Sequence, residues 1–333
     1  MKTLTTILFL TALTCFAEDK TPADSPFTPQ AIKPGGIILP LYAPTSPLLK
    51  RERIHEAENY NSATGGKGPI TNVINIHNPS IEVHLATDRS LNGAAVILAP
   101  GGGHKILWVG PEGADYVPFF DKIGVSTIIL RYRLRVDGYE PTIDAVNDAF
   151  QAIRLVRAHA AEWKLDPAKI GIVGFSAGAE LSSPTALFFN EFEKQNSGPS
   201  DTLAKVSARP DCVGVIYPGP TPFTKAPEIP IPANVPPSFI ACAGSGDRVH
   251  ALWATDYFTA MLKATVPNLE MHIYGRGGHG VSAKDHDTMP YGTWRERFLD
   301  WFRDLGFLDK PGMETKAAVA VAAYAKRTGA TKP

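Results

Sequence analysis

A serine flanked by glycines gives this sequence its most specific chemical signal. The motif Gly174-Phe175-Ser176-Ala177-Gly178 ends an apolar run, residues 170–175, and a helix-forming stretch follows it. This pattern is typical of a sharp strand-to-helix turn that exposes a serine hydroxyl at the end of a sheet. Glycines on both sides avoid collisions with the adjacent strand and helix. Ser176 is therefore the candidate nucleophile, and the alternative is a glycine-rich turn that happens to contain serine.

A serine hydroxyl becomes a strong nucleophile only when a base removes its proton, and histidine is the usual base. The chain has nine histidines, and His279 lies in Gly277-Gly278-His279-Gly280, just after an expected strand at 269–274. The glycines allow this loop to fold over the serine. His286, in a polar stretch before the final expected helix, is the second candidate. We expect His279 to be the base.

The third member of such a triad is a carboxylate that orients the imidazole. Asp247 follows the expected strand 238–243, in Gly244-Ser245-Gly246-Asp247, and lies between the serine and the histidine in the chain. Asp247 could also cap the helix that follows it. Asp211 and Asp256 fit less well, because one precedes a strand and the other lies within a helix.

A triple glycine supplies candidate donors for a developing oxyanion. Pro100-Gly101-Gly102-Gly103-His104 follows the expected strand 94–99. The N–H groups of Gly102 and Gly103 can approach a substrate oxygen closely, and Ala177 would add a third donor. Each such donor contributes about 3–4 kcal/mol of transition-state stabilisation in comparable sites. A nucleotide site is disfavoured, because neither a G-x-G-x-x-G motif nor a P-loop lysine is present.

These motifs all follow apolar runs in a regular alternation of strands and helices. The alternation predicts an α/β fold with a mostly parallel central sheet flanked by helices on both faces. The first two strands alternate polar and apolar residues, as half-exposed strands do. The segment 219–237 contains seven prolines and is expected to be irregular. Strands are expected at 70–76, 81–85, 94–99, 125–132, 170–175, 212–217, 238–243 and 269–274, and helices at 111–123, 142–163, after Ser176, 251–265 and 291–304.

The composition is that of an ordinary soluble protein, with 333 residues, 44% hydrophobic and 20% charged. Its zero net charge gives no electrostatic reason to expect nucleic acid or an anionic membrane as partner. Residues 1–17 read as a signal peptide, with an apolar run after Lys2 and small residues at Cys15 and Ala17. The run is short for a membrane span, so we expect a secreted or periplasmic protein without membrane insertion. A lipoprotein signal with an acylated Cys15 is the alternative.

Five stretches together resemble a known superfamily. They are Pro100 to His104, Leu130-Arg131-Tyr132-Arg133-Leu134, Ala152 to Arg157 with Leu165-Asp166-Pro167, the Ser176 motif and Gly277 to Gly280. The chain resembles the α/β-hydrolase superfamily, and within it the secreted acetyl-xylan-esterase-like and feruloyl-esterase-like carbohydrate esterases, over roughly residues 90–305. The resemblance implies a serine carboxylic-ester hydrolase that needs no cofactor. Its expected substrates are short acyl esters, acetyl above all, on a polysaccharide or oligosaccharide.

The chain departs from this family at two positions. Ala179-Glu180 stands where relatives commonly have Gly-His, and His104 stands where they often have an aromatic residue. We therefore take His104 and Glu180 as pocket candidates. Two other functions remain open at this point, a serine peptidase of the same fold and a non-catalytic binding protein. We expect no propeller-like domain before the hydrolase, which disfavours a peptidase, and the complete triad disfavours a binding protein.

The chain divides into four expected parts. After the signal peptide we expect a flexible leader at 18–36, a single α/β-hydrolase domain at 37–309, and a peripheral C-terminal tail at 310–333. Cys212 and Cys242 are expected to be buried thiols on neighbouring strands. Their spacing fits no zinc pattern, and we expect no metal site.

Overall fold

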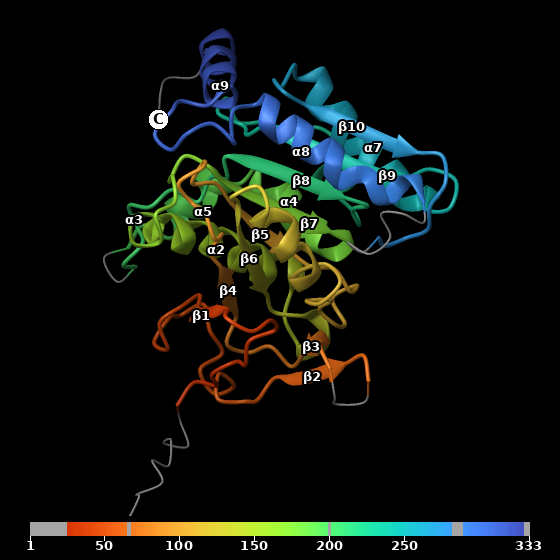
Figure 1. Ribbon diagram of the computed structural model, residues 1–333. Helices are drawn as coiled ribbons and strands as arrows, with labels where there is room; N and C mark the ends of the chain where they lie inside the picture. Colours follow the sequence, from red (N-terminus) through yellow and green to blue (C-terminus); the bar gives the residue numbers. More distant parts are fainter. Residues whose placement is uncertain (1–24, 65–67, 199–200, 282–288, 330–333) are drawn as a thin grey trace, which may run out of the picture.

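A mostly parallel sheet forms the centre of the molecule. The computed structural model describes residues 25–64, 68–198, 201–281 and 289–329. In this part of the chain eight strands form one sheet in the order β1-β4-β6-β5-β7-β8-β9-β10, and β2 and β3 form a separate hairpin (Figure 1). Among the strands of the described residues, the antiparallel pairs are β1 with β4, β4 with β6, and the hairpin. The strands are β1 Ile37–Pro40, β2 Asn59–Ser62, β3 Ile70–Ile74, β4 Ser80–His84, β5 Ala95–Ala99, β6 Ser126–Arg131, β7 Ile170–Phe175, β8 Cys212–Ile216, β9 Ser238–Ala243 and β10 Glu270–Tyr274.

Helices cover both faces of this sheet. The chain steps from β5 to β6 in one direction along the sheet and from β6 through β7, β8 and β9 to β10 in the other. Right-handed crossovers therefore place α1 on one face and α2, α4 and α7 on the other. Helix α8 lies on the same face as α1 and packs against it, with the ring centroids of Phe120 in α1 and Phe298 in α8 6.4 Å apart. The helices are α1 Val117–Asp121, α2 Val146–Ala158, α3 Ala160–Trp163, α4 Ala179–Thr185, α5 Phe189–Gln195, α6 Pro222–Lys225, α7 Arg248–Lys263, α8 Trp294–Asp304 and α9 Lys316–Arg327. The expected fold class is confirmed.

Among the expected elements that differ in detail from those observed, two have a clear local cause. The long helix expected at 142–163 is divided, because a π-helical turn at Pro141–Ala145 precedes α2 and His159 separates α2 from α3. The proline-rich segment 219–237 contains the short helix α6, so the expectation of wholly irregular structure is wrong there. Pro222 occupies the first turn of α6, where its missing N–H costs nothing, and Thr221 forms a capping box with Thr224.

Strand β4 is buried on both faces, which corrects the expectation of a half-exposed strand. The buried carboxylate of Glu82 explains this, because it pairs with Arg131 of β6 and accepts hydrogen bonds from the N–H groups of Ile32 (2.6 Å) and Lys33 (3.0 Å). A buried carboxylate needs such partners to be tolerated. The alternation in the sequence shows that Glu82 is polar, but it does not show that the segment containing Ile32 and Lys33 covers it.

These hydrogen bonds fall within the expected leader at 18–36. Ile32 and Lys33 are bonded to Glu82 of β4, and the N–H of Phe27 donates to the carbonyl of Ile54. Residues 18–24 and the expected signal peptide at 1–17 lie outside the described residues.

The C-terminal segment also packs on the body of the protein. Residues 316–327 of the expected peripheral tail form α9, which buries Ala317, Val321 and Tyr324. The Tyr324 hydroxyl donates a hydrogen bond to the carbonyl of Ala264 at the end of α7, with an O–O distance of 3.1 Å. The tail is therefore anchored by an amphipathic helix.

Cys212 on β8 and Cys242 on β9 are buried and free, and burial raises the pKa of the Cys242 thiol to about 12.

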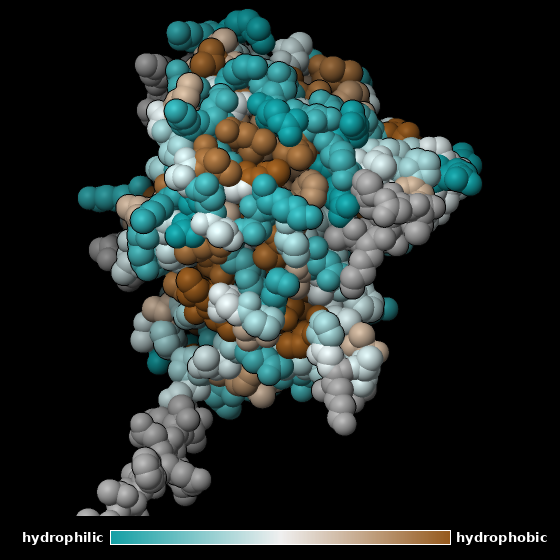
Figure 2. Space-filling model, viewed as in Figure 1, coloured by the Kyte–Doolittle hydropathy of each residue, from teal (hydrophilic) through white to brown (hydrophobic). Residues whose placement is uncertain are grey.

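Among the described residues, no helix is long and apolar enough to cross a membrane. On the face shown in Figure 2, hydrophobic residues form separate patches between hydrophilic ones.

Candidate active site

Three loops at the carboxyl ends of parallel strands bring Ser176, His279 and Asp247 together. The Oγ of Ser176, after β7, lies 2.8 Å from Nε2 of His279, after β10. The Nδ1 of His279 lies 2.8 Å from Oδ2 of Asp247, after β9. Asp247 is buried, with 7% of its surface exposed, while the Ser176–His279 contact lies at the surface. These distances are within the range in which a base can accept the serine proton.

Close backbone packing explains the glycines around Ser176. A Cβ on Gly178 would lie 1.9 Å from the carbonyl oxygen of Ala99, and a Cβ on Gly174 would lie 2.2 Å from that of Gly178. Ser176 itself has φ +51°, the left-handed region that costs a non-glycine residue energy. The strained turn Ser176–Gly178 lifts the hydroxyl out of the sheet at the start of α4.

Asp247 occupies the N-cap position of α7, but its side chain makes no capping hydrogen bond. One carboxylate oxygen bonds His279, and the other, Oδ1, lies 2.5 Å from Nδ1 of His250. The ring of His250 stacks on that of His279 with centroids 3.8 Å apart. Sequence reasoning did not identify His250. The spacing Asp-x-x-His at the start of a helix was the available signal, because residues three apart share a helix face.

The alternative triad residues lie elsewhere. Asp211 pairs with Arg157 at 2.8 Å and accepts a hydrogen bond from the N–H of Ile170. Asp256 lines a different hollow on α7, described below. His286 lies outside the described residues.

The triple-glycine loop adopts backbone conformations that favour glycine. Gly102 has φ +133° and Gly103 has φ +62°, and a Cβ on Gly102 would meet the carbonyl oxygen of Ile106 at 2.0 Å. Both glycines line the same pocket as Ser176, and Ala177 directly follows the serine. The loop is anchored to the β2–β3 hairpin, because the backbones of Leu107 and Val73 exchange two hydrogen bonds.

Two buried side chains brace this loop from behind. The Tyr132 hydroxyl donates to the carbonyl of Pro100 at 2.6 Å. The N–H of Gly101 donates to Oε2 of Glu112 at 2.5 Å, and the Tyr217 hydroxyl donates to Oε1 at 2.7 Å. Burial raises the pKa of the Glu112 carboxyl above its ordinary value. Sequence reasoning did not identify Glu112, since one acidic residue in a loop carries no pattern.

The candidate pocket has a volume of about 550 Å³. Of the two pocket candidates, Glu180 lines it, while the buried His104 does not. His104 lies next to Glu180, with 3.4 Å between Nε2 and Oε2, and has φ +58°. The lining residues are Gly102, Gly103, Trp108, Glu112, Ser176, Glu180, Gly219, Pro220, His250, Trp253, His279 and Gly280.

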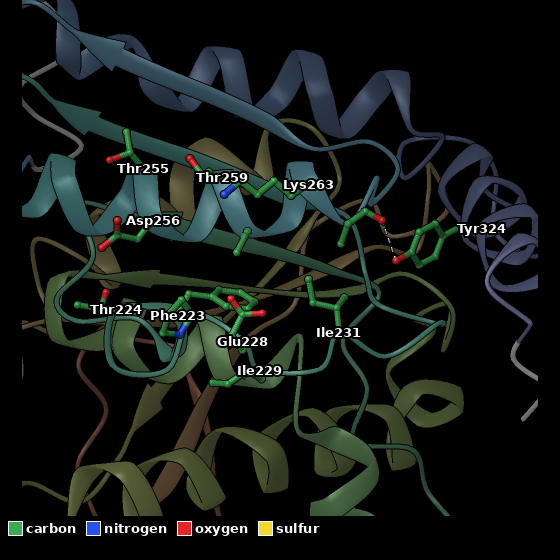
Figure 3. Close-up of a pocket in the computed structure, with 13 residues that line it drawn as sticks. Phe223, Thr224, Glu228, Ile229, Ile231, Thr255, Asp256, Thr259, Lys263 and Tyr324 are labelled. Carbon is green, nitrogen blue, oxygen red and sulfur yellow. Dashed lines mark hydrogen bonds between the residues drawn. The ribbon is translucent and has the colours of Figure 1, made fainter.

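A larger hollow of about 750 Å³ lies between α7 and the proline-rich segment. Figure 3 shows its side chains, among them Glu228, Asp256, Lys263 and Tyr324. The residues that line it include no serine, cysteine or histidine. Size alone therefore does not identify the reactive site, and the smaller pocket with the Ser176–His279 pair is the candidate.

The same residues bear on metal binding. Asp247, His250 and His279 each offer a ligand atom, and these atoms lie within 4.8 Å of one another. Each imidazole already uses Nδ1 in a hydrogen bond to the carboxylate. A metal ion bound through Nδ1 of His279 would leave the ring proton on Nε2. Nε2 could then not accept the proton of Ser176, so metal binding and the role of base exclude each other.

Comparison with known proteins adds independent findings. A family model described as BD-FAE matches residues 83–229. An acetylxylan esterase from Xylanibacter ruminicola is 26% identical over 227 residues, which cover 65% of this chain and 45% of that protein. An endo-1,4-beta-xylanase B from Butyrivibrio fibrisolvens is 27% identical over 141 residues, 42% of this chain and 21% of that protein. The match thus spans less than half the length of these relatives.

Solved structures of esterases share the fold. An acetyl ester-xyloside bifunctional hydrolase from Caldicellulosiruptor lactoaceticus superposes with a TM-score of 0.58 and 26% identity, over 69% of this chain and 89% of that chain. Esterase 2 of Thermogutta terrifontis with bound propionate superposes with a TM-score of 0.59 and 22% identity, over 72% of this chain and 93% of that chain. At 22% identity, the second likeness concerns the fold alone.

The chain therefore has the α/β-hydrolase fold, as the sequence motifs predicted. Within that class it is similar to carbohydrate esterases of the acetyl-xylan-esterase type. The esterase names of the acetylxylan esterase and of the bifunctional hydrolase agree with the expectation of a carboxylic-ester hydrolase.

Proposed function

We propose that this chain is a secreted serine esterase that removes short acyl groups, acetyl above all, from a polysaccharide or oligosaccharide. The observation that carries the proposal is the unbroken hydrogen-bond chain from Ser176 through His279 to Asp247. The similarity to a protein named acetylxylan esterase supports an acylated sugar as substrate.

The geometry supports acylation through a tetrahedral intermediate, which forms in one step and collapses in the next. His279 Nε2 takes the proton of Ser176 Oγ, which attacks the ester carbonyl and forms a tetrahedral oxyanion. Asp247 holds the other ring nitrogen and stabilises the imidazolium. The N–H groups of Gly102, Gly103 and Ala177 are the proposed donors to the oxyanion. Collapse of the intermediate breaks the ester bond, and His279 returns the proton to the departing sugar hydroxyl.

Deacylation repeats these events with water. His279 takes a proton from a water molecule as the resulting hydroxide attacks the acyl-enzyme, and then gives that proton to the Ser176 oxygen; the product leaves as a carboxylic acid, which loses its proton to solvent. The residues named here complete both half-reactions without a cofactor.

The pocket favours a small acyl group. Glu112 and Glu180 both line it, so a long apolar chain would lie against carboxyl groups. Each methylene gains about 0.8 kcal/mol only when it is fully buried in apolar surroundings. We therefore propose that nitrophenyl acetate is hydrolysed faster than nitrophenyl octanoate.

The proposal is tested by incubating the protein from residue 18 onward with acetylated xylan, feruloyl esters, glucuronate methyl esters and a peptide substrate. We expect acetate release from xylan, and stoichiometric modification of Ser176 by a fluorophosphonate probe. A folded Ser176→Ala variant should lose on the order of 10⁴-fold or more in kcat and all labelling. Peptide cleavage without acetate release would instead favour a peptidase, and absence of labelling would favour a binding protein.

Secretion has its own test. When the full chain is expressed in a Gram-negative host, we expect the exported protein to begin at Glu18. A cytoplasmic protein that retains residues 1–17 would contradict this part of the proposal.

A further inference from the structure

Helix α7 presents two aromatic side chains to the candidate pocket in addition to its Asp247 cap residue. His250 and Trp253 both line the pocket, and with Asp247 they recur at intervals of three residues, which places them along one side of the helix. Their rings meet edge to face, with centroids 5.1 Å apart and planes at 90°. Neither side chain takes part in the hydrolytic steps described above.

The hydrogen bonds at Asp247 assign the donor atom, Nδ1, in both imidazoles. The carboxylate can only accept, so His250 and His279 each donate from Nδ1, and each neutral ring then has an acceptor at Nε2. His279 Nε2 accepts from Ser176. Among the described residues, His250 Nε2 has no hydrogen-bond partner. Because the two rings are stacked with both Nδ1 atoms at one carboxylate, their Nε2 atoms lie on the same side, and that side is the pocket.

The chemistry of the proposed reaction indicates which part of a substrate lies next to His250 and Trp253. His279 gives its proton to the leaving group, so the leaving group departs beside His279 Nε2. In a sugar ester the leaving group is the sugar itself. A ring stacked 3.8 Å from His279 therefore borders the sugar and not the acyl group.

We propose that His250 and Trp253 form the subsite for the sugar unit that carries the ester. This inference rests on the proposed esterase function. His250 Nε2 accepts a hydrogen bond from the free hydroxyl next to the ester, and the indole of Trp253 packs on the apolar C–H face of the sugar ring. A large flat apolar surface beside a polar acceptor suits a pyranose, which has a hydroxylated rim and an apolar face.

The experiment compares a sugar ester with an ester that has no sugar. For each variant, kcat/KM is measured on acetylated xylooligosaccharide and on vinyl acetate, and the ratio of the two values is the readout. His250→Asn keeps a donor where Nδ1 stands and removes the acceptor at Nε2, and we expect the ratio to fall about threefold to tenfold. Trp253→Ala should lower it about tenfold or more, mainly through KM for the oligosaccharide.

Leu252→Ala is the matched control, because Leu252 lies on the same helix turn, is 56% exposed and is not a pocket residue. Its ratio should equal that of the wild type. If all three variants keep the wild-type ratio while both substrates are hydrolysed, the subsite is wrong and the esterase function stands. If the wild type hydrolyses neither ester, both proposals fail.

Discussion

The clearest test of how the fold supports the site concerns Glu112, which bridges the triple-glycine loop and Tyr217. Its two oxygens accept from the N–H of Gly101 and from the Tyr217 hydroxyl. In Glu112→Ala the Tyr217 hydroxyl can still donate to the carbonyl of Val281, 3.4 Å away. The buried N–H of Gly101 loses its partner, which costs about 1–3 kcal/mol of unfolding free energy.

The substitution Glu112→Gln separates hydrogen bonding from charge. The amide oxygen can accept from Gly101, and the amide nitrogen can donate to the Tyr217 hydroxyl, so the pairing survives. We expect Glu112→Gln to keep most of the activity. Glu112→Ala should lower kcat about 10-fold to 100-fold, because a loop that is misplaced by about 1 Å holds its donors out of position.

The pH dependence follows from the raised pKa of Glu112. Below the ordinary carboxyl pKa the group is protonated in both the folded and unfolded states, and its stabilising contribution is fully present. As the pH rises through the raised folded pKa, the wild type loses this contribution, while Glu112→Gln has no proton to lose. The wild type should therefore be more stable than Glu112→Gln by a larger margin at pH 5 than at pH 8.

Urea denaturation of both proteins at the two pH values measures this margin. A margin that is constant or grows with pH would refute the assignment of a raised pKa. Equal kcat values for Glu112→Ala and the wild type would refute the bracing of the loop.

Three further outcomes follow from other buried groups. Asp247→Asn should lower kcat about 10⁴-fold with little change in the fold, because an amide no longer enforces the productive tautomer of its imidazole partner; steady-state kinetics and circular dichroism check this. Asp148→Asn should cost about 3 kcal/mol in urea denaturation, because the buried guanidinium of Arg133 loses its buried counter-charge at 2.7 Å and keeps only the more exposed Asp144 at 3.2 Å. Cys212 and Cys242 should react with a thiol reagent only after denaturation, since both are buried and burial raises their pKa values.

The sequence predicted those parts of the fold and site that depend on local patterns. Apolar runs bounded by glycine marked the central strands, and the Gly-x-Ser-x-Gly motif located Ser176 at the end of β7. The chain order of serine, aspartate and histidine also pointed to the three residues that the structure brings within hydrogen-bonding distance. Their catalytic roles remain proposals.

The features that sequence reasoning missed depend on contacts between distant segments. The strand at 81–85 was expected to be half-exposed, although Arg131 and the backbone of residues 32 and 33 bury its Glu82. Helix α7 begins at Arg248, three residues earlier than expected, and Asp247 is the N-cap residue of this helix. His250 therefore lies in the first turn, within reach of the Asp247 carboxylate. Glu112 meets Tyr217 across 105 positions of the chain. No local periodicity carries such information.

The central claim is that Ser176 carries the acyl group during turnover. The most direct measurement is mass spectrometry of peptides from the protein quenched in acid during hydrolysis of nitrophenyl acetate. We predict one acetyl group on the peptide that contains Ser176 and none on that peptide from Ser176→Ala. An acetyl group on a different residue that turns over at the catalytic rate, or full activity of Ser176→Ala, would contradict the account.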